Sequence, residues 1–322
     1  MMDTLFPLIP TIKQLTFEKT KRLFPQGIDL LLFDVTTLYF ESTESDDLRK
    51  FGYSKDHRFN TSQVVLALAT NSDGLPIGYE LFEGNRAEVR TLAASIESWK
   101  PLFNIGSVCF VGDRAMMSKG NVELLDSLNY HYIIAAKLKS LPENLQKAIM
   151  DQNHYRPTVM GQSLAWIGEF EHQHQRLIVS YKSARAVKDQ KERQAVLDKI
   201  KKHMGQKGNA KKLITNQGVK KFITLDNNAE FTLNQENIEK AQQWDGLHGV
   251  ISNIKHDNPE SLIARYAKLW KIEESFRINK HTLQMRPIYH FKPERIHAHI
   301  ALCYMSFSVL RHLEYQVNLT QK

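Results

Sequence analysis

The sequence predicts an α/β protein built on a mixed β-sheet that helices flank. The first observation is a set of short, nearly continuous apolar runs that are typical of buried strands, at 28–34, 63–69, 77–82, 107–111 and 131–136. The second is helical spacing of apolar residues at 85–99 and 118–128, between the last three runs. Three strands followed by helix, strand, helix and strand indicate a mixed sheet covered by helices.

The strand and helix boundaries carry local signals. The run IDLLLFD at 28–34 leads on toward Tyr39 and ends its apolar part at an acid, so we expect a central strand with Asp34 at its end. Asp73-Gly74 predicts a hairpin turn between the second and third strands. Ser118 is a candidate N-cap for the helix at 118–128. A further helix is expected at 10–24 in a short lead-in of residues 1–27.

The pattern is interrupted between residues 137 and 245. Strands are expected there at 164–170, 175–181 and 221–225, a lysine-rich helix at 184–204, and a loop at Gly205, Gly208 and Asn209. The pattern then resumes with a strand at 249–254, a helix start at 258–261 (NPES), a helix at 266–280 and a last helix at 293–315.

The basic charge of the chain is concentrated in one segment. The 322 residues carry a net charge of +8, but residues 182–221 hold thirteen Lys or Arg against three acids, a net of +10. The remainder is therefore close to −2, and a polyanionic partner is favoured. Val196, Leu197, Ile200 and Met204 give this segment an apolar stripe, so its outer face is either a solvated surface or a non-specific phosphate-binding one.

Composition also indicates the compartment. No apolar run approaches the roughly 18 residues of a membrane helix, and the start of the chain lacks the features of a signal peptide. Cys109 and Cys303 both lie in apolar surroundings and are expected to be buried free thiols. We expect a cytoplasmic, nucleoid-associated protein with no membrane contact. The scattered histidines show no zinc-site spacing and are interpreted as structural or DNA-facing.

Three acids stand where α/β folds place ligand and metal sites. Asp34 and Asp113 follow apolar strand runs, and Glu273 lies within the helix at 266–280. Crowded carboxylates repel one another unless a cation is present, and oxygen ligands suit Mg²⁺ or Mn²⁺. By spacing alone, each acid has an ordinary alternative: a turn cap for Asp34, a pair with Arg114 for Asp113, and a solvated pair with Arg277 for Glu273.

The helix at 266–280 (YAKLWKIEESFRINK) combines these groups. Tyr266, Glu273 and Lys280 are seven residues apart, and in one continuous α-helix they would line one edge. Trp270 and Arg277 would lie beside that edge, with Phe276 close by.

Several motifs in order resemble the DDE transposases of the "family four" superfamily of bacterial insertion sequences. LLFDVTTLYFES and FVGDRAMMSKGN resemble the two aspartate motifs. The third motif is similar in register at Tyr266, Glu273 and Lys280, with a close match over WKIEESFR. GYSKDHR (52–58), GLPIGYELFEGN (74–85) and RPIYH (286–290) also resemble that branch, so the resemblance covers about residues 28–312.

The resemblance implies an RNase H-like mixed sheet in two parts, 28–137 and 251–322. A mostly β insertion subdomain, 138–250, would precede the catalytic C-terminal helix. Asp34, Asp113 and Glu273 would bind two Mg²⁺ (or Mn²⁺) ions as the catalytic triad, while Tyr266, Lys280, Arg277 and Lys271 would contact DNA. The activity implied is cleavage at mobile-element ends and strand transfer into target DNA, by a homodimer that pairs two ends of double-stranded DNA. Trp244 or Trp270 would either stack on a displaced base or, as we favour, serve packing.

Two departures leave alternatives open. Leu269 stands where the family motif has Arg, and only 33 residues precede Asp34. An inactive or truncated DNA-binding remnant, and a metal-dependent nuclease of the same fold that cuts without joining, are the competing interpretations.

Overall fold

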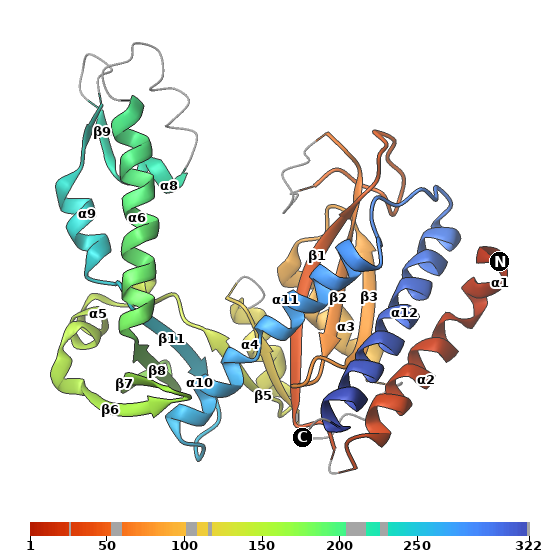
Figure 1. Ribbon diagram of the computed structural model, residues 1–322, viewed down its shortest axis with the longest axis horizontal. Coiled ribbons are helices and arrows are strands. Elements are labelled where there is room, and N and C mark those ends of the chain that lie inside the picture. Colours follow the sequence, from red (N-terminus) through yellow and green to blue (C-terminus); the bar gives the residue numbers. More distant parts are fainter. Residues whose placement is uncertain are drawn as a thin grey trace. The chain divides into compact units, whose positions relative to one another are not determined.

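The computed structural model describes residues 1–25, 27–52, 60–100, 108–114, 118–203, 217–225 and 231–320. The chain forms two compact units (Figure 1). The first contains Met1–Ala135 together with Ile251–Lys322, and the second contains Ala136–Val250.

In the described part of the first unit, five strands pair in the order β3-β2-β1-β4-β5. Their bounds are β1 (Leu30–Tyr39), β2 (Gln63–Thr70), β3 (Pro76–Glu83), β4 (Cys109–Gly112) and β5 (His131–Ala135). The first three strands pair antiparallel, while β4 runs parallel to both β1 and β5. This mixed sheet, with helices flanking it, confirms the predicted α/β class and is compatible with an RNase H-like core.

β1 is buried on both of its faces, which explains why most of its residues are apolar. The expectation that the strand ends at Asp34 is wrong, because Asp34 is the fifth residue of a ten-residue strand. Antiparallel pairing with β2 continues past the acid, from Asp34 opposite Leu68 to Tyr39 opposite Gln63. The acid therefore lies in the middle of the strand and not in a loop.

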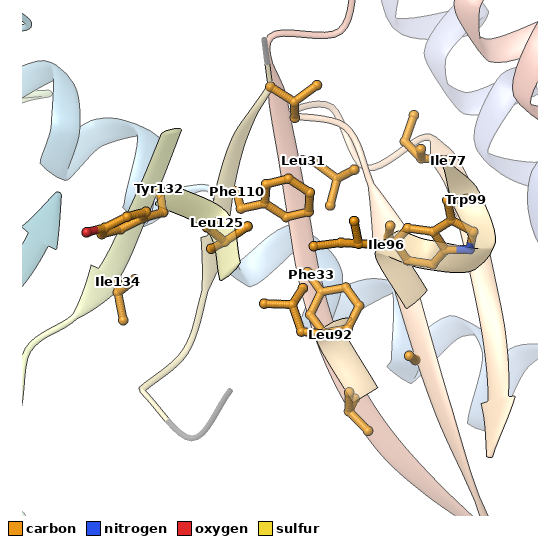
Figure 2. Close-up of a cluster of buried hydrophobic side chains, with 14 of the residues drawn as sticks. Leu31, Phe33, Ile77, Leu92, Ile96, Trp99, Phe110, Leu125, Tyr132 and Ile134 are labelled. Atoms are coloured by element: carbon orange, nitrogen blue, oxygen red, sulfur yellow. The ribbon is translucent and has the colours of Figure 1, made fainter. Parts of the chain in front are cut away.

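One face of the sheet forms the main core with α3 (Thr91–Trp99) and α4 (Lys119–Ser127). Alternate residues of β1 point to this side, since Leu31, Phe33 and Val35 belong to the cluster that contains Trp99. Figure 2 shows the large members of this cluster gathered against the strands. The Phe33 and Trp99 rings are 6.0 Å apart, and Trp99 Nε1 donates a hydrogen bond to Glu80 Oε1 at 3.0 Å.

Of the two helices on this face, one begins as its local signal predicts and the other begins later. Ser118 Oγ accepts a hydrogen bond from the backbone N–H of Asn121 at 3.3 Å, which confirms the predicted N-cap of α4. The helix predicted from residue 85 is shorter, because Glu88–Arg90 forms a 3-10 turn and α3 begins only at Thr91.

The helices α10 (Pro259–Ala267), α11 (Trp270–Arg277) and α12 (Pro293–Thr320) contact the sheet on the side of Asp34. Tyr79 of β3 shares that face, because it pairs with Leu68, which pairs with Asp34. The Tyr79 ring lies 4.6 Å from the ring of Tyr304 on α12. α11 contacts β1 and β2 and crosses β1 in Figure 1. Asn258 caps α10 by accepting from the Ser261 N–H at 2.7 Å, as predicted.

The N-terminal helices pack at one edge of this unit. α1 (Met2–Leu5), the 3-10 turn Phe6–Leu8 and α2 (Ile9–Arg22) contact α12, and α2 also contacts β3. Lys13 of α2 reaches Glu80 Oε1 at 2.8 Å. The helix predicted at 10–24 is confirmed.

The second unit contains an antiparallel sheet and several helices. β6 (Tyr155–Met160), β7 (Ser163–His172) and β8 (Gln175–Tyr181) pair in sequence, and β11 (Leu247–Ser252) follows β8 in the sheet order. The helices are α5 (Glu143–Met150), α6 (Ser183–His203), α8 (Gln217–Lys220) and α9 (Gln235–Gln242), and a hairpin joins β9 (Ile223–Leu225) to β10 (Phe231–Leu233). We expected an insertion subdomain of mostly β structure, and this expectation is wrong, because the unit also contains several helices, of which α6 alone spans 21 residues.

The α6 helix has the apolar stripe that its sequence predicts. Leu197 and Ile200 are buried against Val219 and Phe222, and Val196 packs at the edge of this cluster. Met204 and the predicted loop residues Gly205, Gly208 and Asn209 lie outside the described residues.

The remaining compositional predictions concern thiols and membranes. Cys109 and Cys303 are free and buried, as predicted, and burial raises the pKa of the two thiols to about 12 and about 11. Among the described helices, none is long and apolar enough to cross a membrane.

Removing the Trp99 side chain should lower the free energy of unfolding by about 3–5 kcal/mol, because it empties a fully buried site in the main core. Trp99→Ala is compared with Trp270→Ala, whose side chain is 52% exposed and should cost under about 1 kcal/mol. Urea unfolding followed by circular dichroism measures both. Equal losses in the two variants would contradict this core assignment.

His248 should make stability depend on pH. Burial, with smaller effects of Arg185 and Lys182, lowers the pKa of this β11 side chain from 6.5 to about 4. Between pH 6.5 and 4, His248 is protonated in the unfolded chain but neutral in the folded one. The contribution of His248 to folding stability is therefore complete above about pH 6.5 and is lost as the pH falls toward 4. Replacing it, as in His248→Gln, should reduce the loss of stability between pH 7.5 and 4.5 in urea unfolding. The fully exposed His174 gives the control His174→Gln, which should keep the wild-type pH dependence.

Candidate active site

Asp34 and Asp113 come to the same level on neighbouring strands. β1 and β4 are parallel, with Leu32 opposite Val111, so two further steps along each strand reach the two aspartates. Residues at one level in adjacent parallel strands point to the same face, and the strands are about 4.8 Å apart. Asp113 directly follows β4, as predicted, and both aspartates are half-buried.

The face that these aspartates share is the one α11 covers. Phe110 belongs to the core on the α3 side, so Val111 and, by alternation, Asp113 point the other way. Glu273 is the fourth residue of the eight-residue α11 and is exposed. Its neighbour Ile272 is fully buried, and this holds α11 against the first unit. Three predicted site residues are thus carried by elements of one face.

The predicted single helix over 266–280 is wrong. α10 ends at Ala267, and the chain tightens before α11 begins at Trp270: Leu269 N–H donates to Tyr266 O at 2.9 Å, and Ile272 N–H donates to Leu269 O at 3.1 Å. These i→i−3 bonds are of the 3-10 type. After Arg277 the chain widens into a π-helix, Ile278–Thr282. Seven-residue spacing therefore does not by itself align Tyr266, Glu273 and Lys280.

Burial of Leu269 accompanies this tightening. Its side chain is only 7% exposed, whereas Lys268 and Trp270 on either side are exposed. The position where the family motif has Arg is occupied here by a packed apolar residue at the turn between α10 and α11.

The predicted DNA-contacting residues lie along this segment. Tyr266 is near the end of α10, and Lys280 is in the π-helix; both are half-buried. Lys271 Nζ sits 4.2 Å from the ring centroid of Trp270 and 3.9 Å from Glu274, and Arg277 is 3.7 Å from the same carboxylate. Trp270 is exposed, so the packing interpretation is wrong for it. Trp244 is partly buried, with Lys139 Nζ 5.9 Å from its ring centroid.

Arg311 is a structural residue of this region that sequence reasoning missed. It is buried on α12, and its guanidinium lies 3.4 Å from Glu274 and 2.7 Å from Glu314. The same group donates to the backbone carbonyls of Asp73 and Gly74, at 3.0 and 3.2 Å, in the turn between β2 and β3. Arg311 is 37 positions from Glu274 in the sequence and more than 200 positions from the turn. No local sequence signal could therefore reveal these contacts.

Two further motifs of the resemblance are RPIYH and GYSKDHR, and the first of them lies beside β1. Ile288 of RPIYH donates its N–H to Tyr39 O at 3.3 Å and bridges Phe40, so this segment extends beside the last residues of β1. Gly52 of GYSKDHR is described, whereas residues 53–59 lie outside the described part of the chain.

The donor set fits a hard divalent cation in its chemistry. Asp34, Asp113 and Glu273 offer carboxylate oxygens, and two of them come from adjacent strands at one level. In the described ranges, however, no three His, Cys, Asp or Glu side chains are grouped closely enough to hold a metal ion. The two aspartates are the part of the predicted triad for which strand register supports proximity.

Comparison with known proteins bears on the same elements. A family model described as "Transposase DDE domain" matches residues 25–308, which include β1, β4 and α11. The chain belongs to the DDE transposase family. The comparison with curated proteins gave no match. This DDE transposase is therefore an enzyme that acts on DNA, with a general function in transposition and recombination, and its family generally uses divalent metal ions.

Arg311→Met should destabilise the transposase by about 3 kcal/mol or more, because it leaves Glu274 and two turn carbonyls without their buried partner. Arg277→Met is the matched control, since Arg277 also approaches Glu274 but is 72% exposed and should change stability by less than about 0.5 kcal/mol. Thermal unfolding by calorimetry compares the two. Similar midpoints would show that Arg311 does not stabilise the packing of α11 and α12.

Proposed function

We propose that this transposase cleaves DNA at the ends of a mobile element and joins the freed 3′-hydroxyl to target DNA. Asp34, Asp113 and Glu273 are its catalytic residues in this proposal. The observation that carries the proposal is the register of β1 and β4, which brings Asp34 and Asp113 level on the face contacted by α11. We assign 28–137 and 251–322 to the catalytic core and 138–250 to the insertion.

The two aspartates suit a cation because they share one small region of a sheet face. Two carboxylates on adjacent strands repel each other, and a divalent cation between them relieves the repulsion. Asp34 and Asp113 would bind two Mg²⁺ or Mn²⁺ ions, with Glu273 completing the site when α11 brings it to them. When bound, such ions activate an attacking oxygen and stabilise a leaving one in phosphoryl transfer.

The chain's own residues would position the DNA. Lys271, Arg277 and Lys280 supply positive charge along the segment that carries Glu273, and the Tyr266 hydroxyl adds a hydrogen-bonding group. Charged groups of this kind hold phosphates in line for displacement, which needs positioning more than a protein nucleophile. Pairing of two element ends would require a homodimer.

Neutralising one aspartate should strongly reduce strand transfer. The substrate is a labelled duplex that carries the DNA flanking the coding sequence. Asp113→Asn and Asp34→Asn are each expected to reduce joining of this duplex by on the order of 10³-fold, because each variant loses the negative charge of one metal ligand. Glu97→Gln is the control: Glu97 is an exposed acid on α3, at the other sheet face, and the variant should keep wild-type activity.

The same assay separates the competing functions. Cleavage without joining by the wild type would indicate a nuclease, and neither reaction by the wild type would indicate a DNA-binding remnant. Mn²⁺ binding followed by electron paramagnetic resonance gives a second readout, which Asp113→Asn should weaken and Glu97→Gln should not. Equal joining by wild type and Asp113→Asn would refute the assignment.

A further inference from the structure

The outer face of α6 carries a stripe of lysines. Lys188, Lys191, Lys199 and Lys202 are exposed, and at 100° per residue their directions fall within an arc of about 80°. They extend over about 21 Å of helix at 1.5 Å per residue. In Figure 1 α6 is the long green helix, with α9 and α8 beside it. We call these four residues the α6 lysine stripe.

Packing fixes the direction in which this stripe points. The opposite side of α6 buries Leu197 and Ile200 against Val219 and Phe222. Arg193, also on that inner side, makes two hydrogen bonds to the Asp245 carboxylate. Because the helix cannot rotate without exposing this cluster, the lysines remain on the surface of the second unit.

Acids of the same helix neutralise little of the stripe. Lys188 lies 3.8 Å from Glu192, a distance typical of a weak surface pair. Of the other two acids of α6, Asp189 accepts from the Gly246 N–H at 3.0 Å and Asp198 from the Gln194 amide at 2.8 Å. Within the described residues, no ion pair involves Lys191, Lys199 or Lys202. A fixed row of cations is therefore left facing solvent.

We infer that the α6 lysine stripe binds the phosphate backbone of duplex DNA outside the catalytic site, without reading its sequence. The inference rests on DNA being the substrate of this family. A duplex presents one negative charge for about every 1.7 Å of its axis, so a 21 Å row of ammonium groups faces many phosphates at once. Lysine is a flexible point charge suited to such contacts, and phosphate contacts position a protein without specifying bases.

The test is DNA binding by the full chain in EDTA, with a fluorescent 30-base-pair duplex of arbitrary sequence and a salt titration followed by anisotropy. The variant changes Lys188, Lys191, Lys199 and Lys202 together to Gln, which keeps helix propensity. The matched control changes Lys19, Lys119, Lys147 and Lys240 to Gln. These four are exposed as well, so both variants lose the same net charge.

The stripe variant should lower the salt slope of log K by about 3.6, since each of the four lost phosphate contacts removes about 0.9, and should weaken binding by at least about 10-fold at 0.1 M salt. The control should keep the slope and stay within about 3-fold. Equal effects in both variants, no effect in either, or weaker binding with an unchanged slope would each overturn the inference. Metal-free binding is measured separately from catalysis: a stripe effect on binding in a wild type that neither cuts nor joins DNA would refute the proposed chemistry and still support this surface.

Discussion

β1 is hydrogen-bonded to β2 along its length and to β4 along its first residues, and both of its faces are covered. A strand in that position is mostly apolar, because each polar group it carries has to be satisfied inside the protein. Asp34 is the only charged residue of β1, and it stands at the level to which the β4 register brings Asp113. The geometry of the candidate site therefore follows from the pairing of one central strand.

The α11 helix serves two purposes with two adjacent acids. Glu273 is exposed, whereas Glu274 turns toward Arg311, which also holds the β2–β3 turn and Glu314. Successive residues on a helix differ by 100° in direction, so one can be used for chemistry while its neighbour ties the helix to the fold. The chain changes direction on both sides of α11. The 3-10 turn at Leu269 and the π-helix after Arg277 accommodate these changes, so that α11 can keep its fixed position.

The positive charge of the chain is concentrated in one segment of the second unit. The strong excess of lysine belongs to residues 182–221, which carry a net charge of +10, while the remainder of the chain sums to about −2. A DNA-processing enzyme of this kind must hold a polyanion next to carboxylates that repel it. Placing cations on a separate helix, α6, whose apolar side is packed, supplies attraction without neutralising the acids that are proposed to bind metal.

Local chemistry determined much of this protein. The five core strands, the caps at Ser118 and Asn258 and the packed stripe of α6 follow from apolar spacing and capping residues, and the three candidate acids could be named from motifs. Tertiary structure decided the rest, because it depends on partners distant in the chain. Pairing with β2 carries β1 past Asp34, burial of Leu269 accompanies the break in the predicted 266–280 helix, and Arg311 meets Glu274 only once α12 packs on α11. The spacing of residues in the sequence determines the directions of side chains within one helix or strand. Strand register and burial, which depend on the tertiary structure, determine how helices and strands pack against each other.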